Sequence, residues 1–186
     1  MMLYVPYLVF EVNGKEYMID AYFSKKLEKI ERVSALIKPI DRDLPKTAKN
    51  HLPILLKENE LEEFLKKLFV EVYEQSGERL NARLKHMRRW NIFRFIGIPV
   101  GFLRHIKREE DLAKENRETM LSLAILRKIL DIKNPEDINS IKITAKYYLY
   151  YKIEIKGNQI FNEKGKDIIY TQLLEIDNGF KKSFNI

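Results

Sequence analysis

The sequence of 186 residues contains 34 Lys or Arg, 27 Asp or Glu and no cysteine, and 45% of its residues are hydrophobic. This length suits a single domain, 1–186, and the composition is that of a globular chain rather than a disordered one. The lack of cysteine excludes disulfides, thiolate catalysis and cysteine-ligated metal centres. The N-terminus lacks the positive flank and uninterrupted apolar stretch of a signal peptide, so a cytoplasmic location is expected.

The formal net charge of +7 is concentrated in one part of the chain. Between Glu78 and Arg108 there are nine basic residues and a single acid, which leaves 25 basic and 26 acidic residues of the totals 34 and 27 for all the rest. The remainder is therefore close to neutral. A local excess of this size indicates a polyanionic partner.

The N-terminal residues predict a β-hairpin. Residues 3–12 and 15–23 are rich in aromatic and β-branched side chains, and they flank Asn13-Gly14. This residue pair favours a type I′ turn, because both central positions of that turn need a positive φ. A helix is then expected from Ser24 to the residues before Pro39, since apolar side chains recur there at helical spacing.

The middle of the sequence predicts three helices. Apolar residues recur every three or four positions over 61–72, and Gly77 is expected to end this first helix in a left-handed conformation. A second helix is expected from Glu78 to about Phe95. A third follows from the region 104–109 and ends at Leu130.

The residues after Asn134 predict a short helical turn followed by antiparallel strands. From Ile141 to Lys156 apolar and polar residues alternate over a length that exceeds an ordinary strand, so a bulge or bend is expected within it. Turn residues flank the apolar run from Ile168 to Ile176. That run is accordingly predicted to be another strand of a meander.

These elements together predict an α+β fold with an N-terminal β-hairpin, a central segment of three to four helices and a C-terminal antiparallel β-meander. Within the single domain, residues 1–56 hold the hairpin, a helix and a connector. Residues 57–133 are helical, and 134–186 form the meander.

The helix predicted from Glu78 carries two stripes at helical spacing. Leu80, Leu84 and Met87 are expected to be buried, and the neighbouring stripe of Arg, His and Trp is expected to be exposed. Arginine pairs bidentately with phosphates, and an indole can stack on a base. With the other cations of the basic segment, the predicted nucleic-acid site comprises Arg79, Arg83, His86, Arg88, Arg89, Trp90, Arg94, Arg104, Lys107 and Arg108.

The sequence therefore predicts a non-enzymatic protein that binds DNA or RNA through the phosphate backbone, with little sequence selectivity. No cofactor is expected, because the chain contains no glycine-rich phosphate loop and no other cofactor motif. No metal ligand set is expected either, since its three histidines are far apart in the sequence.

Three alternative hypotheses remain open, of which membrane association is the least favoured. Residues 90–103 are mostly apolar and are bracketed by basic residues, which suits docking on another protein or on a second copy of the chain. This segment is too short to span a bilayer, although it could lie in a membrane interface. Glu154 and Lys156, with Asp137, have the outline of a Mg²⁺-dependent nuclease centre.

Overall fold

The structure is a computed structural model that describes residues 2–27, 29–96, 102–157 and 159–176, with the side chains of 30–31, 90–96, 102–103 and 173–176 left undescribed. The chain forms two compact units. The first, here called the sheet unit, comprises Met1–Lys29, Leu36–Phe64 and Ile141–Ile186, and the second, the helical unit, comprises Ile30–Ala35 and Leu65–Ser140. Strands at both ends of the sequence and helices in the middle give the predicted α+β fold.

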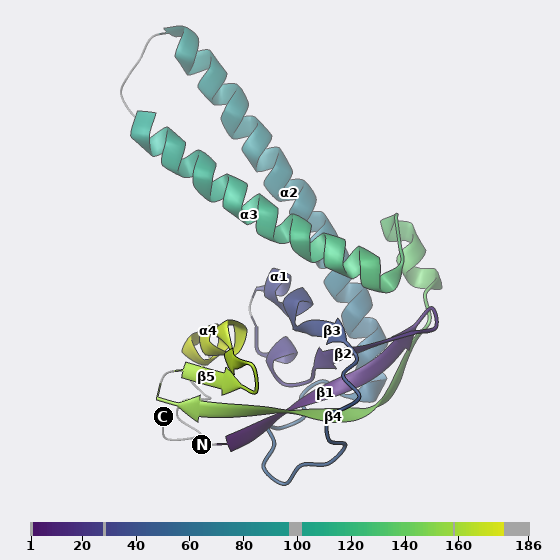
Figure 1. Ribbon diagram of the computed structural model, residues 1–186. Helices are drawn as coiled ribbons and strands as arrows, with labels where there is room; N and C mark the ends of the chain where they lie inside the picture. The colour runs from purple at the N-terminus through teal and green to yellow at the C-terminus, as the bar shows by residue number, and fades with distance from the viewer. Residues whose placement is uncertain (1, 28, 97–101, 158, 177–186) are drawn as a thin grey trace. The chain divides into compact units, whose positions relative to one another are not determined.

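The described residues of the sheet unit form a six-stranded antiparallel sheet in the order β3-β2-β1-β4-β5-β6. Figure 1 shows β1 and β4, from opposite ends of the sequence, side by side at its centre. The strands are β1 (Met2–Val12), β2 (Lys15–Asp20), β3 (Ile37–Pro39), β4 (Ile143–Lys156), β5 (Gln159–Asn162) and β6 (Gly165–Lys166).

The predicted N-terminal hairpin is confirmed. Val12 pairs with Lys15, and the two residues between them have positive φ angles, 50° at Asn13 and 74° at Gly14. A positive φ at both central positions is the requirement of a type I′ turn, which Asn and Gly meet at little steric cost. The turn therefore fixes the register of β1 against β2.

The predicted irregularity in the long strand is also confirmed. Val9 of β1 pairs with Tyr147 of β4, but the next residue, Phe10, pairs with Ala145. Lys146 is thus the extra residue of a β-bulge on β4. Its amine lies 2.5 Å from Glu11 Oε2 and 2.8 Å from Glu16 Oε1, so the bulged side chain joins β4 to both strands of the hairpin.

The helix predicted from Ser24 to Pro39 is wrong. The chain instead forms a 3₁₀ turn η1 (Phe23–Lys25), a short helix α1 (Ile30–Val33), a second 3₁₀ turn η2 (Ser34–Leu36) and the edge strand β3. Ile37 and Pro39 pair with β2, and an edge strand tolerates proline because one side of it needs no ladder hydrogen bond.

The strand predicted at 168–176 is wrong as well, because this run forms the helix α4 (Ile168–Ile176). Asp167 begins it, and its Oδ1 accepts a hydrogen bond of 3.0 Å from the backbone N–H of Tyr170. Helices commonly start at such a capping residue. The periodicity of a short apolar run does not distinguish a buried strand from a helix, so the cap is the informative signal.

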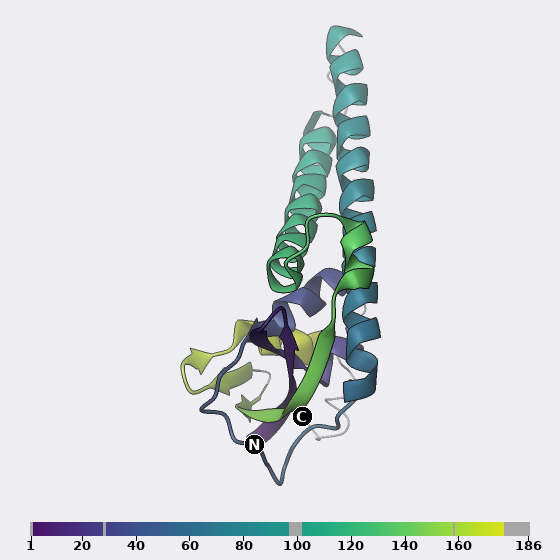
Figure 2. The ribbon, with the colours of Figure 1, turned by 90° about the vertical axis from the view of Figure 1, so that its right-hand side faces the viewer.

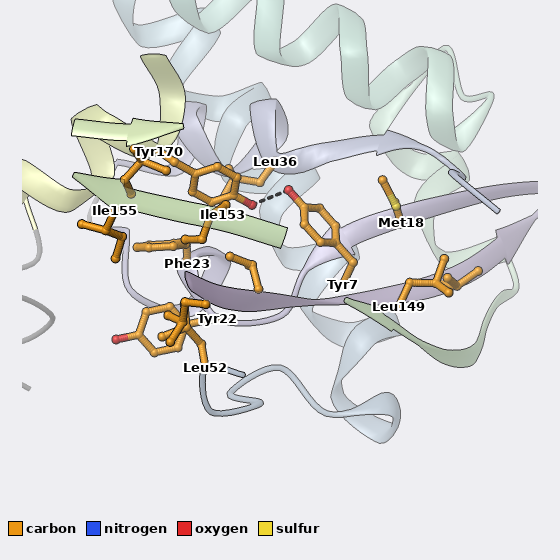
Figure 3. Close-up of a cluster of buried hydrophobic side chains, with 14 residues drawn as sticks. Tyr7, Met18, Tyr22, Phe23, Leu36, Leu52, Leu149, Ile153, Ile155 and Tyr170 are labelled. Carbon is orange, nitrogen blue, oxygen red and sulfur yellow. Dashed lines mark hydrogen bonds between the residues drawn. The ribbon is translucent and has the colours of Figure 1, made fainter. Parts of the chain in front are cut away.

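The core of the sheet unit gathers side chains from β1, β4 and α4 (Figure 3). Tyr7, Phe23 and Tyr170 are among its largest fully buried side chains. The rings of Phe23 and Tyr170 have centroids 5.3 Å apart. Each side chain of this size stabilises the fold by roughly 1.5–3 kcal/mol through burial. Tyr170 therefore anchors α4 to the core of the sheet unit.

A polar network lies inside this core. Asp20 is fully buried; its Oδ1 accepts hydrogen bonds from the backbone N–H groups of Tyr22 and Phe23, and its Oδ2 accepts one of 2.5 Å from the hydroxyl of Tyr170. The hydroxyls of Tyr170 and Tyr7 are also hydrogen-bonded to each other (Figure 3). Burial raises the pKa of Asp20 to about 6, against the opposing effect of these hydrogen bonds.

Lys38 of β3 closes the network from the edge of the sheet. Its amine lies 5.0–5.5 Å from the ring centroids of Tyr7, Tyr151 and Tyr170. Burial lowers the pKa of Lys38, while the nearby charges of Asp167 and Asp20 act in the opposite direction. Three aromatic rings therefore replace part of the water around this half-buried cation.

The helical unit is built on two long helices that lie side by side and run in opposite directions (Figures 1 and 2). They are α2 (Leu61–Ile96), preceded by the 3₁₀ turn η3 (Glu58–Glu60), and α3 (Phe102–Leu130), followed by the predicted turn η4 (Pro135–Ser140). No helix within the described residues has both the length and the apolar character needed to cross a membrane.

The predicted helix break at Gly77 is wrong, since α2 passes through this position without interruption. Gly77 does not have the positive φ of a helix C-terminal glycine, and a methyl group added there would meet no atom within 4 Å. The expected first and second helices of the middle segment are therefore one helix of 36 residues.

Candidate nucleic-acid interface

Buried and half-buried residues follow one pattern along both α2 and α3. They recur at alternating steps of four and three positions, the spacing of a coiled-coil seam, and Arg79, Arg83 and His86 make the contacts with α3 described below. On α2 these seam residues are Leu65, Phe69, Val72, Ser76, Arg79, Arg83 and His86. On α3 they are His105, Glu109, Leu112, Asn116, Thr119, Leu123, Leu126 and Leu130.

The seam changes from apolar to polar along its length. Beyond Ser76, Arg79 donates hydrogen bonds to the backbone oxygen of Glu115, at 3.1 Å, and to the hydroxyl of Thr119. Arg83 Nε lies 2.7 Å from Glu109 Oε1 in an ion pair. Two arginines of the predicted site are thus directed at α3.

The two predicted histidines meet at the same seam. The rings of His86 and His105 stack with centroids 4.2 Å apart and an interplanar angle of 15°. Burial and the neighbouring charge of His86 lower the pKa of His105, and Glu109 offsets part of this shift. His105 is therefore mainly neutral at pH 7 and adds little positive charge to the interface.

The apolar stripe of α2 lies on the solvent side. Leu80, Leu84 and Met87 are 45%, 43% and 45% exposed. We expected these residues to be buried and the stripe of Arg79, Arg83 and His86 to be exposed, and this expectation is wrong. In the structure the apolar stripe is exposed, and the stripe of Arg79, Arg83 and His86 is half-buried. Hydrophobicity alone did not identify the inner face, because hydrogen bonds and an ion pair hold this half of the seam.

The remaining cations form a surface of their own. A helix turns about 100° per residue, so residues that precede seam positions lie on one face of an antiparallel helix pair and residues that follow them lie on the other. One contact checks this geometry: Arg127 and Tyr73 both follow seam residues, and the guanidinium of Arg127 lies 5.8 Å from the ring centroid of Tyr73.

Four basic residues lie on one face of the hairpin, near the end of α2 and the start of α3. Lys85, Arg104 and Arg108 precede seam positions, and Arg89, three residues after His86, lies on the same side of α2. We call these four residues the basic face. All four are exposed, and none has an ion pair with any carboxylate of the described residues. Lys85 was absent from the predicted set. Its position immediately before the seam residue His86 is what assigns it to the basic face.

The other predicted site residues fall outside this face. Arg88 and Lys107 are exposed on the outer sides of α2 and α3. The side chains of Trp90 and Arg94 lie outside the described residues, as does most of the apolar segment 90–103 that was expected to dock on a partner. The basic face therefore draws its cations from both helices rather than from one.

For the nuclease hypothesis, the described residues supply no set of metal ligands around Glu154. Lys156 Nζ forms an ion pair of 2.9 Å with Glu154 Oε2 on β4. In the part of the chain that the structure describes, no three side chains of His, Asp or Glu are grouped so that they could hold a metal ion.

Comparisons with models of known protein families, with curated proteins and with solved structures gave no match to this chain. Its function therefore has to be inferred from its own residues.

Proposed function

We propose that this protein binds nucleic acid through the basic face, without catalysis, and that the sugar–phosphate backbone is the part it contacts. The observation that carries the proposal is the set of four exposed cations, from two helices, that have no carboxylate partner among the described residues. Cations held apart from the chain's own acids remain available to phosphates.

The spacing of the cations suits a chain of phosphates. Arg83 lies opposite Glu109 and His86 opposite His105, so Lys85 and Arg108 are close to one level of the hairpin, and Arg89 and Arg104 to the next. These levels are about 6 Å apart, because four residues of a helix rise by 1.5 Å each. Three of the four cations are arginines, which bind phosphate oxygens bidentately.

This arrangement favours affinity over sequence selectivity. Contacts to phosphates and sugars position a nucleic acid but do not distinguish its bases. We therefore expect binding to DNA and RNA of different sequences with similar affinity.

The direct test is the triple variant Arg89→Ala, Arg104→Ala, Arg108→Ala, with the dissociation constant measured by fluorescence anisotropy on a labelled 20-nucleotide duplex DNA and on the same sequence as RNA. All three side chains are exposed, so the fold should persist, and circular dichroism checks this. We expect at least about a tenfold loss of affinity at 50 mM salt, because three phosphate contacts disappear.

A matched control removes the same charge elsewhere. Lys114→Ala, Lys128→Ala, Lys133→Ala also replaces three exposed cations of the helical unit, but none of them belongs to the basic face. Its affinity should stay within about twofold of the wild-type value. Equal losses in the two triple variants would show that only net charge matters and would contradict the assigned site.

A further inference from the structure

We infer that the face of the helical hairpin opposite the basic face binds the same face of a second copy of the chain, with the two hairpins antiparallel. We call this surface the apolar face. Its members follow seam positions on both helices and include Leu80, Leu84 and Met87 on α2 and Ile106 and Met120 on α3. The inference concerns a different surface from the proposed nucleic-acid site and does not depend on it.

The apolar face carries exposed apolar side chains from both helices. Ile106 and Met120 are 37% and 47% exposed, in addition to the three α2 side chains, and Tyr73 continues the same stripe. These residues come from two adjacent helices and lie on one side of the hairpin, as the contact between Arg127 and Tyr73 shows. Exposed apolar side chains gathered on one side of two helices mark an interaction site.

The stripe on α2 is complementary to itself when it is reversed. If a two-fold axis passes beside Leu80, this residue meets its own symmetry copy, and Tyr73 lies opposite the Met87 of the second copy. On the flank of the stripe, exposed Glu74 then lies within two residues, about 3 Å of helix rise, of the level of exposed Arg88 of the second copy. Apolar residues thus meet apolar residues and an acid meets a base.

The stripe on α3 has the same property about its own centre. Reversal about Ala113 places Ile106 opposite the Met120 of the second copy. It also brings Glu110 to within one residue, about 1.5 Å of helix rise, of the level of Arg117 of the second copy; these are the two exposed charged residues of this stripe. None of the charged residues in these proposed pairs has an ion pair within the described residues of its own chain.

The two centres of reversal coincide in space. Arg83 contacts Glu109, and the two helices run in opposite directions. Leu80, three residues before Arg83 on α2, is therefore at about the level of residue 112, three residues after Glu109 on α3. Ala113 is adjacent to that level. One two-fold axis therefore satisfies both helices, which an accidental apolar surface would not be expected to do.

The charges also select the antiparallel orientation. With the loop ends together, α2 of one copy would face α3 of the other, and exposed Arg88 would approach exposed Lys107. Like charges in an interface oppose association. In the antiparallel arrangement Arg88 instead lies near Glu74 of the second copy, and Lys107 stays in solvent. The basic faces of both copies then remain accessible.

The chain contains no cysteine, so single cysteines can test the orientation. Leu80→Cys lies at the proposed axis, and mild oxidation should link most of the protein into disulfide dimers. Met87→Cys should not be linked, because the two copies of that position would be about 20 Å apart, far beyond disulfide reach. Cross-linking of Met87→Cys without Leu80→Cys would overturn the proposal.

Charge reversal tests the partner itself, with the dimer dissociation constant measured by sedimentation equilibrium in low salt. Glu110→Arg and Arg117→Glu should each weaken the dimer at least about tenfold, since each creates two like-charge contacts. An equimolar mixture of the two variants should restore it, because every contact is again between opposite charges. A chain that remains monomeric, or a dimer unaffected by both variants, would overturn the proposal without affecting the nucleic-acid site.

Discussion

Asp20 is a buried carboxyl group that organises the chain on both sides of it. Its Oδ1 holds the backbone of Tyr22 and Phe23 in the turn that follows β2, and its Oδ2 holds the hydroxyl of Tyr170 from α4. These hydrogen bonds connect residues 150 positions apart in the sequence. Sequence alone could not identify the network, because the apolar run that carries Tyr170 is compatible with a strand or a helix.

The raised pKa of Asp20, about 6 against an ordinary 3.8, makes stability depend on pH. The folded state holds the proton of Asp20 more tightly than the unfolded state does, so protonation of Asp20 stabilises the fold by roughly 3 kcal/mol. This stabilisation is complete below pH 3.8 and is lost as the pH rises through 6. Asp20→Asn should remove this loss. Its stability relative to the wild type should therefore increase from pH 4 to pH 7 in urea unfolding experiments.

The corresponding control is Asp43→Asn, which changes an exposed carboxylate of the same unit. Its stability difference from the wild type should vary much less over the same pH range. A difference for Asp20→Asn that is independent of pH would show that this carboxyl group does not carry the shift.

At the scale of elements, the continuous helix α2 positions both surfaces of the hairpin. The sequence predicted its first turns correctly, because Leu61 to Val72 form a clear apolar stripe. Beyond Ser76 the stripe becomes polar. If Gly77 is taken to end the helix, the apolar residues one position later are mistaken for its continuation. The uninterrupted steps of four and three residues from Leu65 to His86 were the signal that identifies the seam.

Gly77→Ala tests whether α2 is continuous. In an exposed helix interior with open space around the Cβ, alanine should stabilise the protein by about 0.5–1 kcal/mol. A helix that ended here with a left-handed glycine would be destabilised by the same change. Thermal unfolding at a protein concentration that favours the monomer measures the difference, and a lower melting temperature would contradict the continuous helix.

For the whole molecule, the sequence predicted the α+β class, the N-terminal hairpin and the bulged long strand from local patterns of two to sixteen residues. It also located the excess of positive charge, which is a property of composition. It could not predict how that charge divides, because the division depends on which residues of α2 lie opposite α3. Arg79 and Arg83 bind within the hairpin, whereas Arg89 and Arg104 remain exposed.

The proposed function requires that four phosphates can reach the basic face. The measurement that tests it most directly is the salt dependence of nucleic-acid affinity between 50 and 200 mM salt, for the wild type and for the triple variant Arg89→Ala, Arg104→Ala, Arg108→Ala. Four contacts to duplex DNA predict a logarithmic slope of about −3.6 for the wild type and about −0.9 for the variant. A wild-type slope near zero, or one that the variant leaves unchanged, would contradict the account.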